Sequence, residues 1–295
     1  MSSLISHSEV DQYLSCPRKH YYAFGQPAAT GELGLEPKSF GDGLFRGIHG
    51  HAALEIFYKQ IQQGMGSATA ADTAKAYLSL EMMKHPDRMD LFLELQIILT
   101  NYFNYYGLED QDEWEYPAVE ETFEYKGFPF KPDLIRRHKR GGFVQVVDHK
   151  FLANLYTGPE IAIQPQLPKY IGALRKKGYE VKDGIYNLIS NRVYKTKPYD
   201  PKTQLKRVPL KVTNTRIDTT LSEQFAVMEE ILELKDLPND QWKKRARRHA
   251  SAFNCKNCPF LSLCVSELNG QDISVAVKFE FLPNSYGYSE ADITN

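Results

Sequence analysis

Residues 127–151 of the chain read GFPFKPDLIRRHKRGGFVQVVDHKF, and this stretch decides the predicted fold. Residues 128–135 and 143–149 are rich in Phe, Val, Leu and Ile. The polar turn RRHKRGG between them carries the glycine pair expected of a hairpin connection. We therefore expect two antiparallel strands that bring Asp133 close to Asp148.

The second of these strands ends in three charged or polar residues, DHK. Side chains alternate along a strand, so Asp148 and Lys150 share one face and His149 points to the other. Two carboxylates and an ammonium group on one surface are costly to desolvate unless something binds there, and a divalent cation is the usual answer. A lone Asp-x-Lys is more often an exposed pair on an edge strand, because short motifs recur by chance. The preceding run FVQVV instead favours a strand buried on both faces.

The composition is typical of a globular protein. With 295 residues, 42% hydrophobic and 25% charged, the chain can bury a substantial core, and we expect a single domain over 1–295. No apolar run approaches the roughly 20 residues of a membrane span. The start, MSSLISHSEVDQY, lacks the basic and apolar regions of a signal peptide. These features predict a cytoplasmic protein with no membrane partner.

The net charge of −1 does not by itself indicate a nucleic-acid-binding protein, but the basic residues are locally concentrated. They gather at 136–140, at 195–211 and at 243–249, which reads KKRARRH. Such blocks are usually solvated faces. Several of them in one nearly neutral chain also allow a path for phosphate groups.

The four cysteines form a second informative pattern, with CxxCx5C near one end of the chain and one cysteine near the other. They are Cys16, Cys255, Cys258 and Cys264. In a reducing compartment a metal site is a better expectation than disulfides. Zinc commonly takes two close cysteine pairs, whereas three clustered cysteines and a distant fourth suit an iron–sulfur cluster at least as well. Either metal would join residues 1–24 to residues 241–268.

The remaining segments predict alternating helices and strands. A first helix begins near His7, where Ser6 and Glu9 have capping-box spacing, and it ends or bends at Pro17. Helices are also expected over 43–63, 72–85, 88–106, 158–177 and 220–236, strands over 115–125, 184–190, 191–195 and 275–282, and loops over 25–42 and 196–209.

Several polar side chains in these elements are candidate ligands. His51 and Glu55 share one face of the 43–63 helix, although a single helical histidine is more often a packed residue than a ligand. Glu120 and Glu121 are possible acidic ligands, but exposed strand carboxylates are the commoner case.

The helix over 158–177 carries a polar pair. Gln166 and Tyr170 lie one turn apart on a common face. Prolines near the start of the helix leave its register open, with Gln164 as a competing position.

Together these motifs resemble the PD-(D/E)XK nuclease superfamily, and specifically its RecB-like exonuclease branch with an iron–sulfur cluster. That branch includes CRISPR-associated adaptation exonucleases and AddB-type nuclease domains. The resembling residues are Gly47, His51 and Glu55 for a GxxxHxxxE helix, Pro132 and Asp133 for the second motif, Asp148 and Lys150 for DxK, Gln166 and Tyr170 for QxxxY, and the four cysteines. These five elements follow the family's order over 16–264, and 64–110 and the tail after 270 lie outside the resemblance.

The resemblance implies an α/β fold with a restriction-endonuclease-like core, in which helices flank a mixed central sheet. Residues 43–195 would form the catalytic core, with a helical insertion near 64–110. An iron–sulfur staple would join 1–24 to 241–268, leaving 270–295 as a tail.

The resemblance also implies a metal-dependent deoxyribonuclease acting on single-stranded DNA or DNA ends in recombination, repair, phage replication or CRISPR adaptation. His51, Asp133, Asp148 and the carbonyl of His149 would hold Mg²⁺ or Mn²⁺. Lys150 would orient the attacking water or neutralise the phosphate, and Gln166 and Tyr170 would position Lys150. Cys16, Cys255, Cys258 and Cys264 would hold a [4Fe-4S] cluster, with Zn²⁺ as the alternative.

Two other functions remain open from the sequence. One is a non-catalytic DNA-binding or scaffold subunit of a helicase–nuclease or integration complex. The other is an endonuclease, since the same core serves restriction enzymes. No GxxxxGK[ST] motif occurs in the 295 residues, so any unwinding would come from a helicase partner.

Overall fold

A five-stranded mixed sheet is built around β6 (Val144–Leu152) in the computed structural model, which describes residues 4–39, 41–155 and 158–284. The strand order is β2-β5-β6-β7-β8, with β2 at Trp114–Val119, β5 at Leu134–His138, β7 at Val181–Ser190 and β8 at Leu205–Leu210. Strands β6 and β7 are parallel, and the other neighbours are antiparallel. Residues 145–149 of β6 are buried, which confirms the predicted strand with two covered faces.

The predicted hairpin is present, but its first strand is shorter than expected. Strand β5 pairs Leu134 with Val147, and the turn closes with the His138 amide donating to the Phe143 carbonyl (2.9 Å). Residues 128–130 form β4, which pairs with β3 (Phe123–Tyr125) in a separate two-stranded sheet. Pro132 has no N–H to donate to a sheet ladder, so one strand over 128–135 is not formed and that expectation is wrong.

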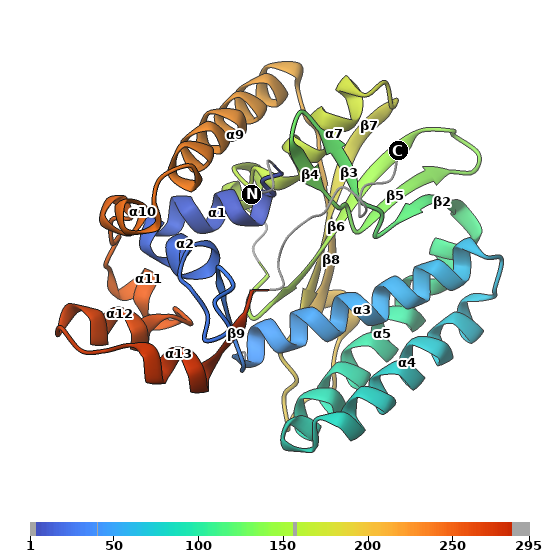
Figure 1. Ribbon diagram of the computed structural model, residues 1–295. Coiled ribbons are helices and arrows are strands. Elements are labelled where there is room, and N and C mark those ends of the chain that lie inside the picture. The colour runs from blue at the N-terminus through green and yellow to red at the C-terminus, as the bar shows by residue number, and fades with distance from the viewer. Residues whose placement is uncertain (1–3, 40, 156–157, 285–295) are drawn as a thin grey trace. The chain divides into compact units, whose positions relative to one another are not determined.

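The chain divides into two compact units, which we describe separately (Figure 1). The sheet unit, residues 42–122 and 131–221, contains the five-stranded sheet. The cysteine unit, residues 1–41, 123–130 and 222–295, contains the four cysteines. In sequence, α9 (Asn214–Lys235) crosses from one unit to the other.

Three helices of the sheet unit cover one face of the sheet. They are α3 (Asp42–Gln62), α4 (Ser67–Lys84) and α5 (Met89–Glu113), with the short 3₁₀ turn η1 (Pro86–Arg88) before α5. Val147, Ile185 and Ile189 of the sheet share their buried core. A Cβ at Gly50 would lie 2.4 Å from the Phe151 ring, so glycine at this position allows α3 to approach β6 closely. This packing sets the place of the next residue, His51.

The opposite face of the sheet is covered by α7 (Gln166–Lys176), which is preceded by the short α6 (Pro159–Ala162). Gly184 of β7 makes room for this helix, because a Cβ there would lie 3.0 Å from Ile171. The expected single helix over 158–177 is therefore two helices. The backbone leaves the helix between them, next to Pro165.

The segment after β7 differs from its prediction. Residues 191–195 are not a strand, and the expected loop over 196–209 contains α8 (Pro201–Gln204) and β8. Leu205 and Leu210 are buried in β8, which explains why this polar sequence joins the sheet. Pro209 is tolerated because β8 is an edge strand.

The cysteine unit is mainly helical. Its helices are α1 (His7–Ser15), α2 (Pro17–Phe24), α10 (Asn239–Arg245), α11 (Ala252–Lys256), α12 (Leu261–Leu268) and α13 (Ser274–Glu280), and β1 (Leu35–Pro37) pairs with β9 (Phe281–Pro283). The Glu9 amide donates to Ser6 Oγ (3.2 Å), which confirms the predicted cap. Most of the expected strand over 275–282 is α13 instead, because its buried Val277 faces the core on a helix. The acidic, Tyr-rich end over 285–295 lies outside the described residues.

A bilayer crossing needs a helix that is both long and apolar. None of the helices in the described part of the chain meets both conditions.

Glu9 is a buried carboxylate that links three segments of the cysteine unit. Its Oε1 lies 3.0 Å from His20 Nε2 and 2.7 Å from Lys235 Nζ. Burial would raise the pKa of the Glu9 carboxyl, but the hydrogen bond with His20 and the charge of Lys235 lower it overall. A lowered folded-state pKa stabilises the fold above the unfolded-state pKa. This stabilisation is lost as pH falls through the lowered value.

We expect Glu9→Gln to lower the free energy of unfolding at neutral pH by about 3 kcal/mol, because Lys235 loses its buried charge partner. Urea unfolding of both proteins at pH 7 and pH 3 measures the effect, and the difference should shrink at pH 3. Asp11→Asn, at an exposed position of the same helix, is the control. Equal stability of Glu9→Gln and the parent protein at pH 7 would contradict this account.

Candidate active site

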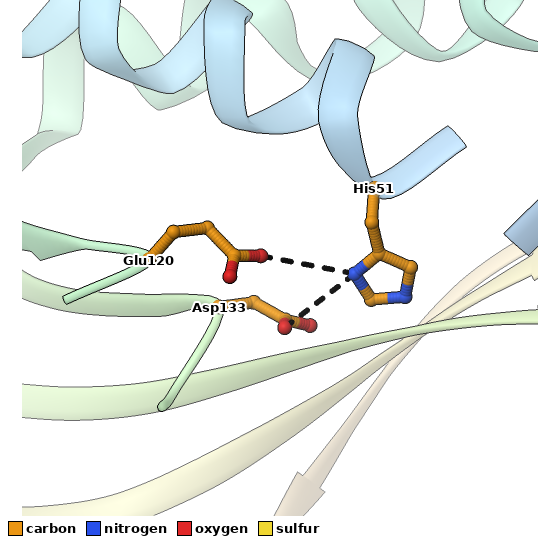
Figure 2. A group of neighbouring side chains, drawn as sticks. All are labelled: His51, Glu120 and Asp133. Atoms are coloured by element: carbon orange, nitrogen blue, oxygen red, sulfur yellow. Dashed lines mark ion pairs between the residues drawn. The ribbon is translucent and has the colours of Figure 1, made fainter. Parts of the chain in front are cut away.

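Three side chains from separate elements converge beside the end of β6 (Figure 2). His51 extends from α3, Glu120 follows β2 and Asp133 precedes β5. His51 Nδ1 lies 3.5 Å from Asp133 Oδ1 and 3.9 Å from Glu120 Oε1. One ligand atom of each residue lies within 4.8 Å of the others. An imidazole and two carboxylates at this spacing are a suitable ligand set for a divalent cation.

Glu120 enters this group because the backbone leaves the strand there. Its φ of 52° lies in the left-handed region, so β2 ends at Val119. Its amide donates to the Asp133 carbonyl (3.0 Å), and only 9% of its side chain is exposed. The expectation of an exposed strand carboxylate is wrong, because strand alternation does not continue through this break. Non-glycine residues with positive φ are uncommon and often mark functional sites.

The charges of this group shift the pKa values of its members. Burial would lower the pKa of His51, but the carboxylates of Asp133 and Glu120 raise it to about 10. Burial would raise the pKa of Asp133, but the charge of His51 holds it well below its usual range. The His149 amide also donates to Asp133 Oδ2. The imidazole of His51 is therefore protonated at neutral pH and pairs with both carboxylates.

Asp148 lies beside the group and is almost fully buried, with 2% exposure. Its Oδ2 is 2.9 Å from Lys150 Nζ but accepts no hydrogen bond within the described residues. Burial raises the pKa of Asp148 to about 6, although the charge of Lys150 opposes the shift.

Lys150 is held by the polar pair of α7. Its Nζ donates to Gln166 Oε1 (2.6 Å), and Gln166 Nε2 donates to the Tyr170 hydroxyl (3.2 Å). The structure thus brings Gln166, and not Gln164, to the end of β6. The backbone carbonyl of Gln164 accepts a hydrogen bond from the Arg216 side chain (3.0 Å).

The His149 ring points away from Asp148 and Lys150, as strand alternation predicts. Its Nδ1 lies 2.7 Å from Asn187 Nδ2, and the ring stacks on Tyr58 with 5.6 Å between centroids. Burial lowers the pKa of His149 to about 3, so the ring is neutral. A role for His149 as a ligand could involve only its backbone.

Two residues of the GxxxHxxxE pattern do not take part in the group. Glu55 forms an ion pair with Lys59 (2.6 Å). A Cβ at Gly47 would meet no other atom within 4 Å, so packing does not require glycine there. Lys131, which the sequence did not suggest, pairs with Glu120 at 2.7 Å. No sequence pattern pointed to Lys131, because its place depends on the turn at Glu120.

The four cysteines line one cavity of about 540 Å³ in the cysteine unit. All four are free thiols. Burial raises the pKa of Cys258, and the nearby Cys16 and Cys255 add to this effect. Arg248 Nε donates to Cys264 Sγ (3.2 Å). The predicted convergence of the N-terminal cysteine on the C-terminal three is therefore present, in a cavity large enough for a metal centre.

Comparison with known proteins identifies a family. The family model for the PD-(D/E)XK nuclease superfamily matches residues 4–265. Comparison with curated proteins found no match. A solved structure titled "Crystal structure of SSO0001" is 14% identical, with a TM-score of 0.29, over 62% of this chain and 79% of that chain. The family match includes both the five-stranded sheet and the four cysteines.

The position of Glu120 predicts a contribution to metal binding. We expect Glu120→Gln to weaken Mn²⁺ binding by at least about 10- to 100-fold. Loss of an outer-shell partner already has an effect of this size, and here a ligand oxygen loses its charge. Titration calorimetry with Mn²⁺ measures this. Glu121→Gln removes the same charge at the next position and should bind Mn²⁺ like the parent protein. Equal affinity of the two variants would exclude Glu120 as a ligand.

Proposed function

Because the chain belongs to the PD-(D/E)XK nuclease superfamily, whose members use divalent metal ions, we propose that it is a metal-dependent exonuclease acting on single-stranded DNA or DNA ends. One observation carries this proposal. The His51, Glu120 and Asp133 group lies beside Lys150, which forms an ion pair with Asp148 and donates a hydrogen bond to Gln166. A ligand set and a positioned ammonium group at one strand end are what phosphodiester hydrolysis requires.

The side chains of this site divide into ligands and positioning groups. His51, Glu120 and Asp133 would hold Mg²⁺ or Mn²⁺, with the Asp148 carboxylate or the His149 carbonyl completing the shell. The bound ion would polarise the phosphate and lower the pKa of water. An imidazole ligand favours Mn²⁺ over Mg²⁺.

Lys150 is the group we assign to the reacting phosphate or the attacking water. Its side chain is 30% exposed, so the ammonium group reaches solvent while Asp148 and Gln166 fix its direction. Gln166 and Tyr170 would act as positioning residues, since they contact Lys150 or each other. A fixed ammonium group offsets negative charge on the phosphate oxygens without reorganising during the reaction.

The choice of an exonuclease over an endonuclease is supported by the resemblance of the QxxxY pair and the cysteines to the RecB-like branch. A cleavage assay tests this choice. It uses end-labelled single-stranded DNA, end-labelled duplex DNA and closed circles, each incubated with Mn²⁺, Mg²⁺ or chelator. We expect metal-dependent loss of linear DNA and intact circles. Cleaved circles would establish an endonuclease. No cleavage of any DNA would favour a non-catalytic subunit of a helicase or integrase complex.

Lys150 allows a direct test of the reaction. We expect Lys150→Ala to lower the cleavage rate at least about 10³-fold while DNA affinity changes little, because the ammonium group acts at the reacting phosphate. Rates on labelled DNA and fluorescence anisotropy without metal separate the two effects. Lys182→Ala, at the start of β7 and so at the other end of the sheet, is the matched control. A Lys150→Ala protein that cuts at the parental rate would rule out the assignment.

We also propose that Cys16, Cys255, Cys258 and Cys264 hold a [4Fe-4S] cluster. Their cavity is much larger than a single ion needs. Three clustered cysteines and a distant fourth, all lining one cavity, support the cluster over zinc, which commonly takes two close cysteine pairs.

The cysteine cavity predicts a colour and a metal content. Protein purified without oxygen should be brown and carry about four iron atoms per chain. Cys255→Ser should lose most of this iron, because one of four thiolate ligands is removed. Visible absorption and elemental analysis measure both. Colourless protein with one zinc atom per chain would instead establish a zinc site.

The proposed activity fits DNA-end processing in recombination, repair, phage replication or CRISPR adaptation. In each of these a helicase or an integrase would act as the partner that unwinds or receives the DNA.

A further inference from the structure

The segment after β7 folds into an ordered basic arm, residues 191–206. Tyr194 and Lys197 form an antiparallel bridge at its turn. Tyr199 is buried, and its hydroxyl lies 3.1 Å from the carbonyl of Ser190. Gln204 Nε2 donates to the Arg192 carbonyl (2.7 Å). The arm is thus anchored from inside by Tyr199 and Leu205, and it presents its basic side chains to solvent.

The solvent-facing side chains of the arm are strongly basic. They are Arg192, Lys195, Lys197, Lys202 and Lys206, all exposed, and within the described residues none of them forms an ion pair. The single carboxylate of the arm, Asp200, is used locally, since it accepts from the Lys202 amide (3.1 Å) and the Thr203 hydroxyl (3.0 Å). Tyr194 stands among these cations with 49% of its surface exposed.

The arm begins at the strand end that carries Lys150. Strands β6 and β7 are parallel, with Lys150 opposite Leu188 and Leu152 opposite Ser190. The Asn191 amide donates to the Leu152 carbonyl (2.9 Å). At about 3.3 Å per residue, the base of the arm lies roughly 7 Å along the strand from Lys150. A DNA strand with a phosphate at Lys150 can therefore reach the arm within a few nucleotides.

We propose that the basic arm binds the strand of single-stranded DNA that enters the active site, with its lysines on phosphates and Tyr194 stacked on an unpaired base. This inference rests on the proposed function. These five cations pair with no carboxylate in the part of the chain that the structure describes, so they form an uncompensated charge that a polyanion neutralises. An exposed aromatic ring among such cations is the arrangement that binds unpaired bases, which offer a free ring face.

The test measures binding without cleavage, in the Lys150→Ala protein with chelator present. Anisotropy of a labelled oligothymidylate at several salt concentrations gives the affinity and its salt dependence. Replacing Lys195, Lys197 and Lys202 by Gln should weaken binding about 10- to 100-fold near 0.1 M salt. It should also reduce the slope of log affinity against log salt concentration by about 2, because each lost phosphate contact accounts for roughly 0.7. Tyr194→Ala should weaken binding about tenfold and leave the slope unchanged.

The matched control removes three charges at the other end of the same sheet. Arg137 near the end of β5 and Lys139 and Arg140 in the turn before β6 are all exposed, and their replacement by Gln should change affinity less than about threefold. Equal affinities of the arm variant and this control variant for single-stranded DNA would overturn the inference. It would also be overturned if the arm variant lost as much affinity for blunt duplex DNA as for single-stranded DNA. Failure of the parent protein to cleave any DNA would overturn the proposed function instead, because the binding result does not depend on cleavage.

Discussion

The concentration of buried negative charge at the end of β6 is the constraint on which the proposed site depends. Glu120, Asp133 and Asp148 are each nearly buried, and an unpaired buried carboxylate costs several kcal/mol. Three neighbouring cations offset this cost, namely the imidazolium of His51 and the ammonium groups of Lys131 and Lys150. A divalent ion that binds His51 Nδ1 would replace the proton of that imidazole.

The fold holds this cluster from several directions. Gly50 lets α3 approach β6, which places His51 over the strand end. Behind the strand, Asn187 binds the His149 ring and the Tyr102 hydroxyl (2.7 Å each), so the backbone of β6 is fixed where its amide meets Asp133. On the other face, α7 supplies the Gln166 side chain to Lys150.

The sequence was sufficient for the parts of the site that follow regular periodicity. Strand alternation predicted that Asp148 and Lys150 share a face opposite His149, and helical spacing predicted the contact of Gln166 with Tyr170. Glu120 was misjudged, because its inward direction depends on a left-handed backbone position that no periodicity encodes.

The segments that the sequence misassigned share a different cause. Residues 275–280 have a strand-like composition but lie in a helix, since one apolar face is enough to cover a small core. Residues 205–210 look like a polar loop but complete the sheet, because two buried leucines anchor them. In both places tertiary packing overrides local propensity. The same packing produces the basic arm, whose order the composition of the segment did not suggest.

We infer that His51, Glu120 and Asp133 bind one divalent cation beside Asp148 and Lys150. Anomalous diffraction from crystals soaked in Mn²⁺ tests it most directly. The account predicts a single strong peak about 2.0–2.3 Å from His51 Nδ1 and from one oxygen of each of Glu120 and Asp133. A Mn²⁺ peak elsewhere in the crystal, with His51 still paired to both carboxylates, would contradict it.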